Sequence, residues 1–163
     1  MLGLGGHGTV WFSIKLNTEE PIAIKSQNNE GAVNSFKKEI SLMQKLKKYQ
    51  IFTRLYEKLK FNHMLYLVET LHITNLEKLK NFCGGKFSIL TTYKIGIELL
   101  QCLKYIHKAG YIYLNIKGDN ISLLYESIKK SKFINHITII NYGFVPNILK
   151  MIICFCQKRK PLE

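Results

Sequence analysis

The chain has 163 residues, with 24 Lys and Arg against 11 Asp and Glu, so its formal net charge is +13. Hydrophobic residues make up 47% of it and aromatic residues 12%. This composition excludes a disordered, collagen-like, mucin-like or linker chain, because there is enough apolar surface to bury a core, and the length suits one domain or two small lobes.

The first part of the chain predicts strands and one helix. Residues 9–15 alternate apolar and polar side chains, and residues 21–25 form a second apolar run after a polar turn, so a hairpin is expected. Residues 33–48 show the helical spacing of an amphipathic helix with lysines outside, and residues 65–68 suit a buried strand. The apolar positions of the predicted helix are Phe36, Ile40, Met43 and Leu46.

The second part of the chain is dominated by one long predicted helix. Residues 88–109 are periodic throughout, and Gly110 follows as a C-terminal stop. Its apolar stripe is expected to hold Tyr93, Ile97, Leu100, Leu103 and Ile106. Residues 121–124 and 136–140 then read as two short strands, so the whole chain is predicted to be α+β in two lobes, with the boundary near residues 70–75.

Cysteines, apolar runs and the N-terminus indicate an intracellular protein, cytoplasmic or nuclear. The four cysteines have neither the density of a disulfide framework nor the paired spacing of a zinc site, which favours buried or free thiols. Residues 148–156 are too short an apolar run to span a bilayer, and the N-terminus lacks the pattern of a secretory signal, so no membrane association is expected. The cysteines are Cys83, Cys102, Cys154 and Cys156.

The positive charge raises the question of a polyanionic partner, since lysines gain affinity by releasing counterions from nucleic acid. The lysines are scattered over predicted helix surfaces, however, and only residues 157–160 read as a basic tail. We therefore expect no specific nucleic-acid binding, whereas an acidic or phosphorylated protein remains a candidate partner.

A glycine motif opens the chain. Gly3, Gly5, Gly8 and Val10 fit the pattern G-x-G-x-x-G-x-V, in which backbone N–H groups can approach phosphate oxygens without Cβ obstruction. A strand follows the motif directly, which favours a glycine loop inside a hairpin over a dinucleotide-binding turn. Taken alone, the motif is also compatible with an ordinary glycine-rich turn.

Lys25 and Glu39 form a second candidate pair. Lys25 ends a predicted strand, from which its ammonium could reach phosphates under the glycine loop, and Glu39 on the following helix could anchor that ammonium. Any helix can offer such a glutamate, so the pair needs support from other motifs.

Several ordered motifs resemble the protein kinase family, in particular the casein kinase 1 group and its tau-tubulin-kinase-like branch. The most specific stretch runs from Gly85-Lys-Phe-Ser88 through Thr91-Thr92, Gly96 and Ile106-His107 to the segment at residues 110–121. The resemblance covers residues 2 to 147, and the motifs occur at compatible spacings.

The resemblance implies a kinase-like two-lobed fold and a serine/threonine kinase by descent, with ATP in the cleft. Residues 1–72 would form an N-lobe of a five-stranded antiparallel sheet plus one helix, with most of the first strand missing. Residues 73–147 would form a partial helical C-lobe through the Asp-Phe-Gly equivalent, and residues 148–163 a divergent basic tail. A truncated chain or fragment is therefore expected.

The resemblance also assigns site residues. Glu69 falls where the family has an apolar gatekeeper, and Thr70 to His72 would be the hinge that holds the adenine edge. Lys117 matches the catalytic-loop lysine and Asn120 a metal-binding asparagine. The nucleotide-binding residues implied are Gly3, Gly5, Gly8, Val10, Lys25, Glu39, Thr70 and His72.

Two departures bear on catalysis. Asn115 stands where the family has the catalytic aspartate, and its amide is not basic at neutral pH. Asn141 stands where the family has the metal-binding aspartate, so that Mg²⁺ binding should be weak or absent. We therefore expect a pseudokinase or fragment that binds ATP and has lost most or all phosphoryl transfer.

Two alternatives stay open. One is an active kinase with a compensating acid, for which Asp119 is tempting, although its place next to Asn120 suggests that it points elsewhere. The other is a basic scaffold or interaction module that binds no nucleotide.

Overall fold

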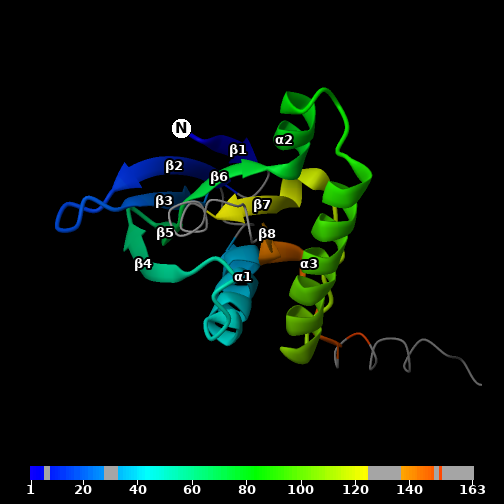
Figure 1. Cartoon of the computed structure of the whole chain (residues 1–163). Coiled ribbons are helices and arrows are strands. Elements are labelled where there is room, and N and C mark those ends of the chain that lie inside the picture. The colour runs from blue at the N-terminus through cyan, green and yellow to red at the C-terminus, as the bar shows by residue number, and fades with distance from the viewer. Residues whose placement is uncertain (6–7, 28–32, 125–136, 149–150, 152–163) are drawn as a thin grey trace, which may run out of the picture.

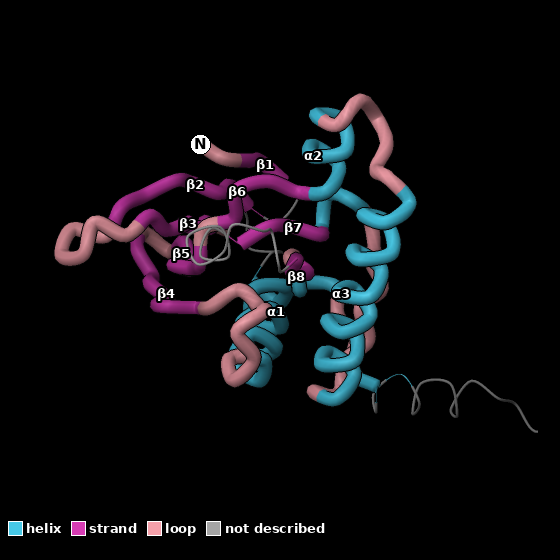
Figure 2. The backbone as a smooth tube through the Cα atoms, viewed as in Figure 1, coloured by secondary structure: helices cyan, strands magenta, loops and turns pink. Residues whose placement is uncertain are grey.

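A computed structural model describes residues 1–5, 8–27, 33–124, 137–148 and 151. Two antiparallel sheets lie side by side, and the helices gather on one side of them (Figures 1 and 2). The predicted α+β fold class is confirmed. Residues 149–150 and 152–163, most of the predicted tail, lie outside the described residues.

The first sheet has five strands in the order β1-β2-β3-β5-β4, all paired antiparallel. The predicted hairpin is confirmed as β2 and β3, whose register pairs Val10 with Lys25. The strands are β1 (Gly3–Gly5), β2 (Gly8–Ile14), β3 (Pro21–Ser26), β4 (Leu55–Phe61) and β5 (Met64–Thr70).

Helix α1 (Val33–Leu46) follows β3 and confirms the predicted amphipathic helix. Phe36, Met43 and Leu46 are buried, as is Leu42, while Lys37, Lys38 and Lys45 are exposed. Burial of this apolar face fixes the side of the helix that carries Glu39, which is also buried.

The second sheet has three strands in the order β6-β7-β8. The chain leaves the first sheet at Thr70 and enters the second at His72, while the domain division after residue 72 stays a prediction. The elements of this part are β6 (His72–Asn75), α2 (Leu76–Phe82), α3 (Ile89–Lys108), η2 (Gly118–Asn120), β7 (Ile121–Leu124), β8 (Ile137–Ile139) and η3 (Tyr142–Phe144).

The ends of α3 follow the predicted signals. Ser88 caps the N-terminus, where its hydroxyl oxygen accepts a hydrogen bond from the Thr91 N–H at 3.1 Å. Gly110 has a φ of +87°, a conformation that glycine adopts without a Cβ penalty, and it terminates the helix.

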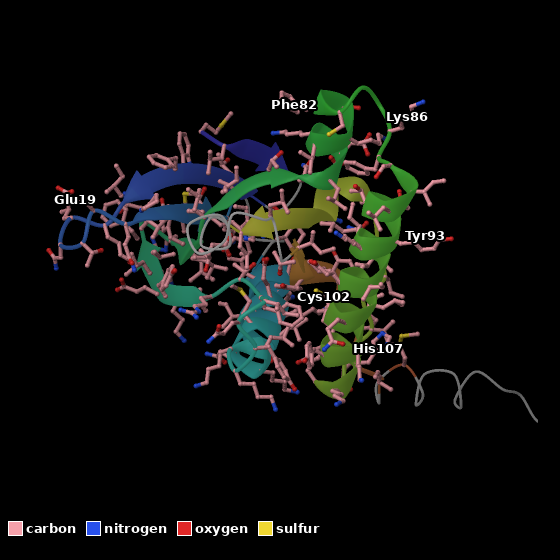
Figure 3. The ribbon with its side chains drawn as sticks, viewed as in Figure 1. Glu19, Phe82, Lys86, Tyr93, Cys102 and His107 are labelled. Atoms are coloured by element: carbon pink, nitrogen blue, oxygen red, sulfur yellow. The ribbon has the colours of Figure 1, made fainter. Side chains whose placement is uncertain are left out.

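The buried face of α3 differs from the predicted stripe. Cys102 and Ile106 are buried and Leu103 packs against them, but Tyr93, Ile97 and Leu100 are 68 to 69% exposed. Figure 3 shows Tyr93 directed away from the molecule and Cys102 directed inward. The helix carries two apolar stripes, and spacing alone does not tell which one faces the core.

The residue patterns do not predict six of the elements: β1, β4, β6, α2 and the short 3₁₀ turns η2 and η3. β4 is an edge strand whose side chains are mostly exposed, so it lacks the buried alternation by which strands are recognised. β1 is three residues long and contains two glycines. Both strands exist because a neighbouring strand supplies their hydrogen bonds.

Candidate functional site

A cleft of about 650 Å³ lies between the two sheets, a volume typical of small-molecule sites. Two groups of residues line it. The five-stranded sheet and α1 contribute Gly3, Gly8, Val10, Ala23, Lys25, Glu39 and Glu69. The second sheet and its neighbouring segments contribute His72, Thr74, Lys78, Asn115, Lys117, Asp119, Asn120, Ser122, Asn141 and Tyr142.

The hairpin of β1 and β2, here called the glycine hairpin, forms one wall of the cleft. Gly3 pairs with Val10 and Gly5 pairs with Gly8. Gly8 has a φ of +154°, and a Cβ there would lie 1.9 Å from the Ser26 carbonyl oxygen, so the close approach of β2 to β3 requires glycine. Gly3, Gly8 and Val10 line the cleft.

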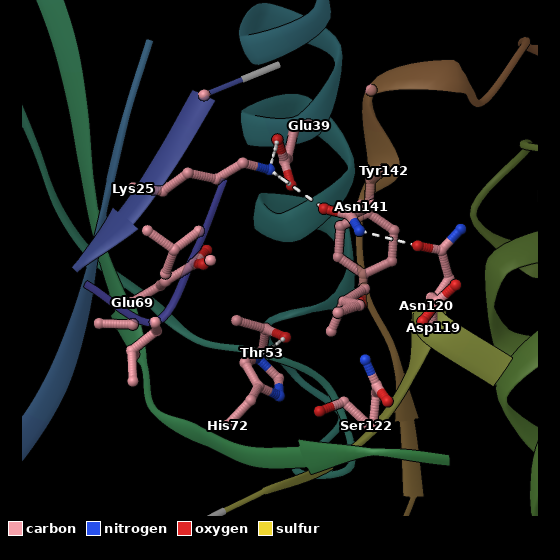
Figure 4. A pocket seen from close by; sticks show the side chains of 18 of the residues that line it. Lys25, Glu39, Thr53, Glu69, His72, Asp119, Asn120, Ser122, Asn141 and Tyr142 are labelled. Atoms are coloured by element: carbon pink, nitrogen blue, oxygen red, sulfur yellow. Dashed lines mark hydrogen bonds and ion pairs between the residues drawn. The ribbon is translucent and has the colours of Figure 1, made fainter. Parts of the chain in front are cut away.

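Lys25 and Glu39 meet inside the cleft, as their spacing indicated (Figure 4). The Lys25 Nζ donates to Glu39 Oε1 and Oε2, both at 2.8 Å, and the two residues are 5% and 3% exposed. Burial alone would lower the pKa of Lys25, but the charges of Glu39 and Glu69 and the hydrogen bonds to Glu39 outweigh it and raise that pKa. The ammonium therefore stays charged.

Asn141, Asn120 and Asn115 continue from this pair as a chain of hydrogen bonds, here called the amide relay. The Asn141 Oδ1 accepts from Lys25 Nζ at 3.5 Å, the Asn141 Nδ2 donates to Asn120 Oδ1 at 2.8 Å, and the Asn120 Nδ2 donates to the Asn115 carbonyl at 2.9 Å. Lysine can only donate, so the oxygen of Asn141 must face it and the nitrogen must face Asn120. All three hydrogen bonds therefore donate in the same direction, from Lys25 toward the Asn115 carbonyl.

Two buried tyrosines hold the segments that carry the asparagines. The Tyr113 hydroxyl donates to the Ile140 carbonyl at 2.6 Å, and the Tyr142 hydroxyl donates to the Ile139 carbonyl. Burial raises the pKa of both phenols, so both keep the proton that they donate. Asn141 itself has left-handed backbone angles, φ 63° and ψ 64°, which asparagine tolerates better than most residues.

Gly143 brings α1 against the Asn141 segment. A Cβ at this position would lie 1.9 Å from the Ser35 Oγ and 3.2 Å from the Ser35 Cβ, so a larger residue would force the Ser35 side chain to move. This contact places Glu39 of α1 next to the amide relay.

Glu69 and His72 line the cleft where β5 ends and β6 begins. Glu69 is 8% exposed, and burial raises its pKa to about 8, although Lys25 opposes the shift. Burial lowers the pKa of His72 to about 4, and Lys25 lowers it further. The His72 Nε2 lies 3.0 Å from the Thr53 Oγ1, so the ring is a neutral hydrogen-bonding group at physiological pH.

Glu69 should make the free energy of unfolding depend on pH. Its folded pKa of about 8 lies above the ordinary 4.5, so between these values the folded chain binds the proton more tightly. The lowered pKa of His72 has the opposite effect on stability, because the unfolded chain binds that proton more tightly, but this effect is confined mainly to pH values below the ordinary pKa of 6.5. From pH 6.5 to 8 the free energy of unfolding should therefore fall, by about 1 to 2 kcal/mol. Denaturant titrations should show a smaller fall in Glu69→Gln than in Glu57→Gln, an exposed control, and equal slopes would contradict this assignment.

The remaining predicted residues divide into two groups. Lys117, Asn120, Asn115 and Asn141 line the cleft together. Thr70 does not line it, because its N–H donates to the Arg54 carbonyl and its Oγ1 accepts from the Arg54 N–H, both at 3.0 Å. Thr70 therefore fastens β5 to the preceding loop.

Asp119 is one of the residues that line the cleft, and Figure 4 places it beside Asn120. That its side chain points away from the catalytic position stays a prediction. The 3₁₀ turn η2 changes the direction of the chain here, which residue spacing could not indicate.

Sequence reasoning missed Thr53, Lys78 and Ser122 as lining residues. Thr53 and Ser122 carry no motif, and only the pairing of distant segments brings them to the cleft. Lys78 had a usable signal, because Asn75 precedes a helical run and its Oδ1 accepts from the Lys78 N–H at 2.8 Å, as an N-cap does.

Similarity to known proteins shows which family this chain belongs to. The family model described as protein kinase domain matches residues 1–152. The chain belongs to the protein kinase family. It is 27% identical over 123 residues to a probable serine/threonine-protein kinase of Dictyostelium discoideum, and 29% identical over 136 residues to MAP3K epsilon protein kinase 1 of Brassica napus.

These matches cover 75% and 79% of the chain but only 25% and 10% of the two relatives. The kinase domain match implies in general the use of ATP and Mg²⁺. None of the helices in the described part of the chain has the length and hydropathy needed to cross a membrane.

Both residues that match the family's Mg²⁺ positions are asparagines in this chain. Mg²⁺ in kinases is held by an aspartate together with an asparagine, whereas Asn141 and Asn120 offer neutral amides, and the Asn141 nitrogen donates to the Asn120 oxygen that a metal would need. No cluster of three or more His, Cys, Asp or Glu that could hold a metal occurs among the described residues. In this structure the two amides form a hydrogen bond with each other.

Proposed function

We propose that this protein kinase domain is of the casein kinase 1 type, binds ATP in the cleft with little or no help from Mg²⁺, and has lost most or all phosphoryl transfer. The amide relay is the observation that carries the proposal. It joins the two positions at which the family binds metal, and it does so with uncharged groups.

ATP binding is supported by the wall and the charges of the cleft. The glycine hairpin offers a close backbone approach, and three lysines line the cleft, Lys25, Lys78 and Lys117. Lys25 is held in place by Glu39 before any ligand arrives, so its ammonium needs no reorganisation to meet a phosphate. The backbone of the glycine hairpin and the lysines can contact phosphate groups without a metal ion.

Loss of transfer is supported by the two asparagines. A general base is worth roughly 10² to 10⁴-fold in rate, and the amide of Asn115 cannot supply it. Asn115 instead uses its backbone carbonyl to accept from Asn120. Binding without turnover is the outcome that this set of residues supports.

Assignment to the casein kinase 1 group rests on the motifs at residues 85–121, and the relatives named above do not carry that name. The net charge of +13 supports a further part of the proposal, an acidic or phosphorylated protein as partner. If ATP does not bind, the same charge favours the alternative of a basic interaction module.

The test is isothermal titration of ATP, once with Mg²⁺ and once with EDTA. We expect binding in both, with affinities within about threefold of each other, because Asn120 and Asn141, at the two positions where the family binds Mg²⁺, offer neutral amides that bond to each other. Lys117→Met, which removes an exposed lysine of the cleft, should weaken binding by about fivefold. Lys58→Met removes an exposed lysine on β4 and should leave affinity unchanged.

Each result bears on the proposal. Absence of ATP binding in a folded sample would overturn it in favour of the interaction module. A gain of more than about thirtyfold on adding Mg²⁺ would show a functional metal site and contradict the role given to the amide relay.

A further inference from the structure

The outer face of α1 carries a row of lysines, here called the basic stripe. Residues three, four or seven positions apart share one face of a helix, and these lysines follow that spacing into the turn after α1. Glu39 lies on the opposite side of the helix and lines the cleft, so the stripe lies outside the candidate site. The stripe consists of Lys37, Lys38, Lys45 and Lys48, all of which are exposed.

The charge of the basic stripe is not neutralised by the protein itself. Glu39 is the only acidic residue of α1, and both of its oxygens accept from Lys25. None of the four lysines forms an ion pair with another of the described residues. Like charges at such spacings repel one another, so an anionic partner would relieve this repulsion as well as attract the lysines.

Two tyrosine rings hold lysines of the stripe in position. The Lys45 Nζ lies 4.8 Å from the centroid of the Tyr111 ring, and the Lys48 Nζ lies 5.1 Å from that of Tyr49. Lys45 also donates to the Ala109 carbonyl at 3.3 Å, at the C-terminal end of α3, which lies beside α1 (Figure 1). An ammonium that is already positioned loses less freedom when an anion binds.

Ser41 adds a hydroxyl group to the middle of the stripe. Its Oγ lies 3.1 Å from the Tyr111 hydroxyl oxygen. Two hydroxyl groups have two protons, and the hydrogen bond between them uses one. When Tyr111 donates to Ser41, the Ser41 O–H is left to donate to an anion.

We propose that the basic stripe is a docking surface for a carboxylate-rich segment of an acidic protein. This inference rests on the part of the proposed function that assigns an acidic partner, and it does not need a nucleotide in the cleft. The stripe advances by about 16 Å from its first to its last lysine, so its charges are spread out. A segment of about five extended acidic residues covers this length, whereas a phosphate group concentrates its charge at one point.

The stripe suits nucleic acid less well. It contains no arginine, which is the residue that most often reads a base edge in a duplex. Its two tyrosine rings are already covered by Lys45 and Lys48, so they are not free to stack on bases. An acidic protein segment needs neither kind of contact.

The experiment measures binding of a fluorescein-labelled oligoglutamate peptide of about six residues, by fluorescence anisotropy, at about 50 mM salt. The stripe variant combines Lys37→Gln, Lys38→Gln, Lys45→Gln and Lys48→Gln. The control variant combines Lys58→Gln, Lys60→Gln, Lys86→Gln and Lys94→Gln, which remove the same charge at exposed positions elsewhere. A third variant keeps Lys45, and with it the contact to Ala109, and changes only the other three lysines of the stripe.

The parent chain should bind the peptide, and the stripe variant should bind it at least about tenfold more weakly. The variant that keeps Lys45 should lose about fivefold, and the control variant at most about twofold, since screening limits the effect of distant charges. Affinity for ATP should be the same in all four proteins, because none of the altered lysines lines the cleft.

The outcomes separate this inference from the proposed nucleotide binding. If the parent chain does not bind the peptide, or if the stripe and control variants lose the same affinity, the docking surface is wrong and ATP binding stands. If an oligothymidylate of the same length binds more tightly than the peptide and depends on the stripe, the partner is a nucleic acid and this inference is wrong. If the peptide binds through the stripe but ATP does not bind, the nucleotide part of the proposed function falls and this inference stands.

Discussion

Replacing Asn115 and Asn141 together by aspartate is expected to raise phosphoryl transfer from ATP by at least about 10³-fold over the parent chain. The Asn115→Asp change would supply the carboxylate that orients the acceptor hydroxyl, worth roughly 10² to 10⁴-fold. The Asn141→Asp change would remove the donor that now faces Asn120 and put an anionic oxygen in its place, which gives Mg²⁺ a charged ligand. Both changes fall on residues that line the cleft.

The measurement is transfer of radiolabel from ATP to a serine-containing acceptor protein, with Mg²⁺ present. The control carries Asn34→Asp and Asn81→Asp, which add the same two charges at exposed helical positions, and it should be as inactive as the parent chain. A parent chain as active as the restored double variant would refute the loss of transfer.

Asp119 allows a test of the alternative in which this chain is an active kinase with a compensating acid. It lines the cleft beside Asn120, so a compensating acid has a named candidate. If the chain has lost catalysis, any phosphoryl transfer measured in the parent preparation comes from a contaminating kinase. The Asp119→Asn substitution should then leave that transfer unchanged. Loss of that activity in Asp119→Asn would instead identify Asp119 as the acid of an active kinase.

Glu39→Ala is expected to destabilise the fold by about 3 to 5 kcal/mol, because it leaves the buried charge of Lys25 without its ion-pair partner. Lys25 is 5% exposed, and its two contacts of 2.8 Å to Glu39 would both be lost. For a chain of this length the melting temperature should fall by about 10 °C. Urea denaturation and calorimetry measure the two quantities.

The matched control is Glu20→Ala, which breaks the ion pair of Glu20 with Lys15 at 3.0 Å on the surface. Exposed pairs contribute at most about 1 kcal/mol, so this variant should be nearly as stable as the parent chain. The double variant Lys25→Met, Glu39→Leu removes both charges and should recover at least half of the loss. If it is no more stable than Glu39→Ala, the cost comes from lost packing and not from the unpaired charge.

The sequence predicted those elements whose own residues carry the pattern. Helix α1, the hairpin of β2 and β3, and the ends of α3 at Ser88 and Gly110 are set by local spacing and capping, and the structure confirms them. β1 and β4 depend on hydrogen bonds from a neighbouring strand, so their own sequences say little. The inward face of α3 depends on what packs against it, and the exposed Tyr93 shows that spacing alone selects the wrong stripe.

For the site, the sequence indicated which residues belong to a cleft but not how they bond. The meeting of Lys25 with Glu39 could be expected from motif order. The direction of the amide relay could not, because it depends on the left-handed backbone of Asn141 and on the turn before Asn120. Glu69 was recognised as a departure from the family pattern, whereas its burial follows only from the packing in three dimensions.

The amide relay also bears on how firmly the two sides of the cleft are held together. Together with the pair of Lys25 and Glu39, the relay connects both sheets through a few side-chain hydrogen bonds. The segments that take part are β3, α1, the segment after β8, the turn η2 and the loop that follows α3. Because this connection consists of side chains of the polypeptide itself, the two sheets should keep their relative position without a bound metal ion.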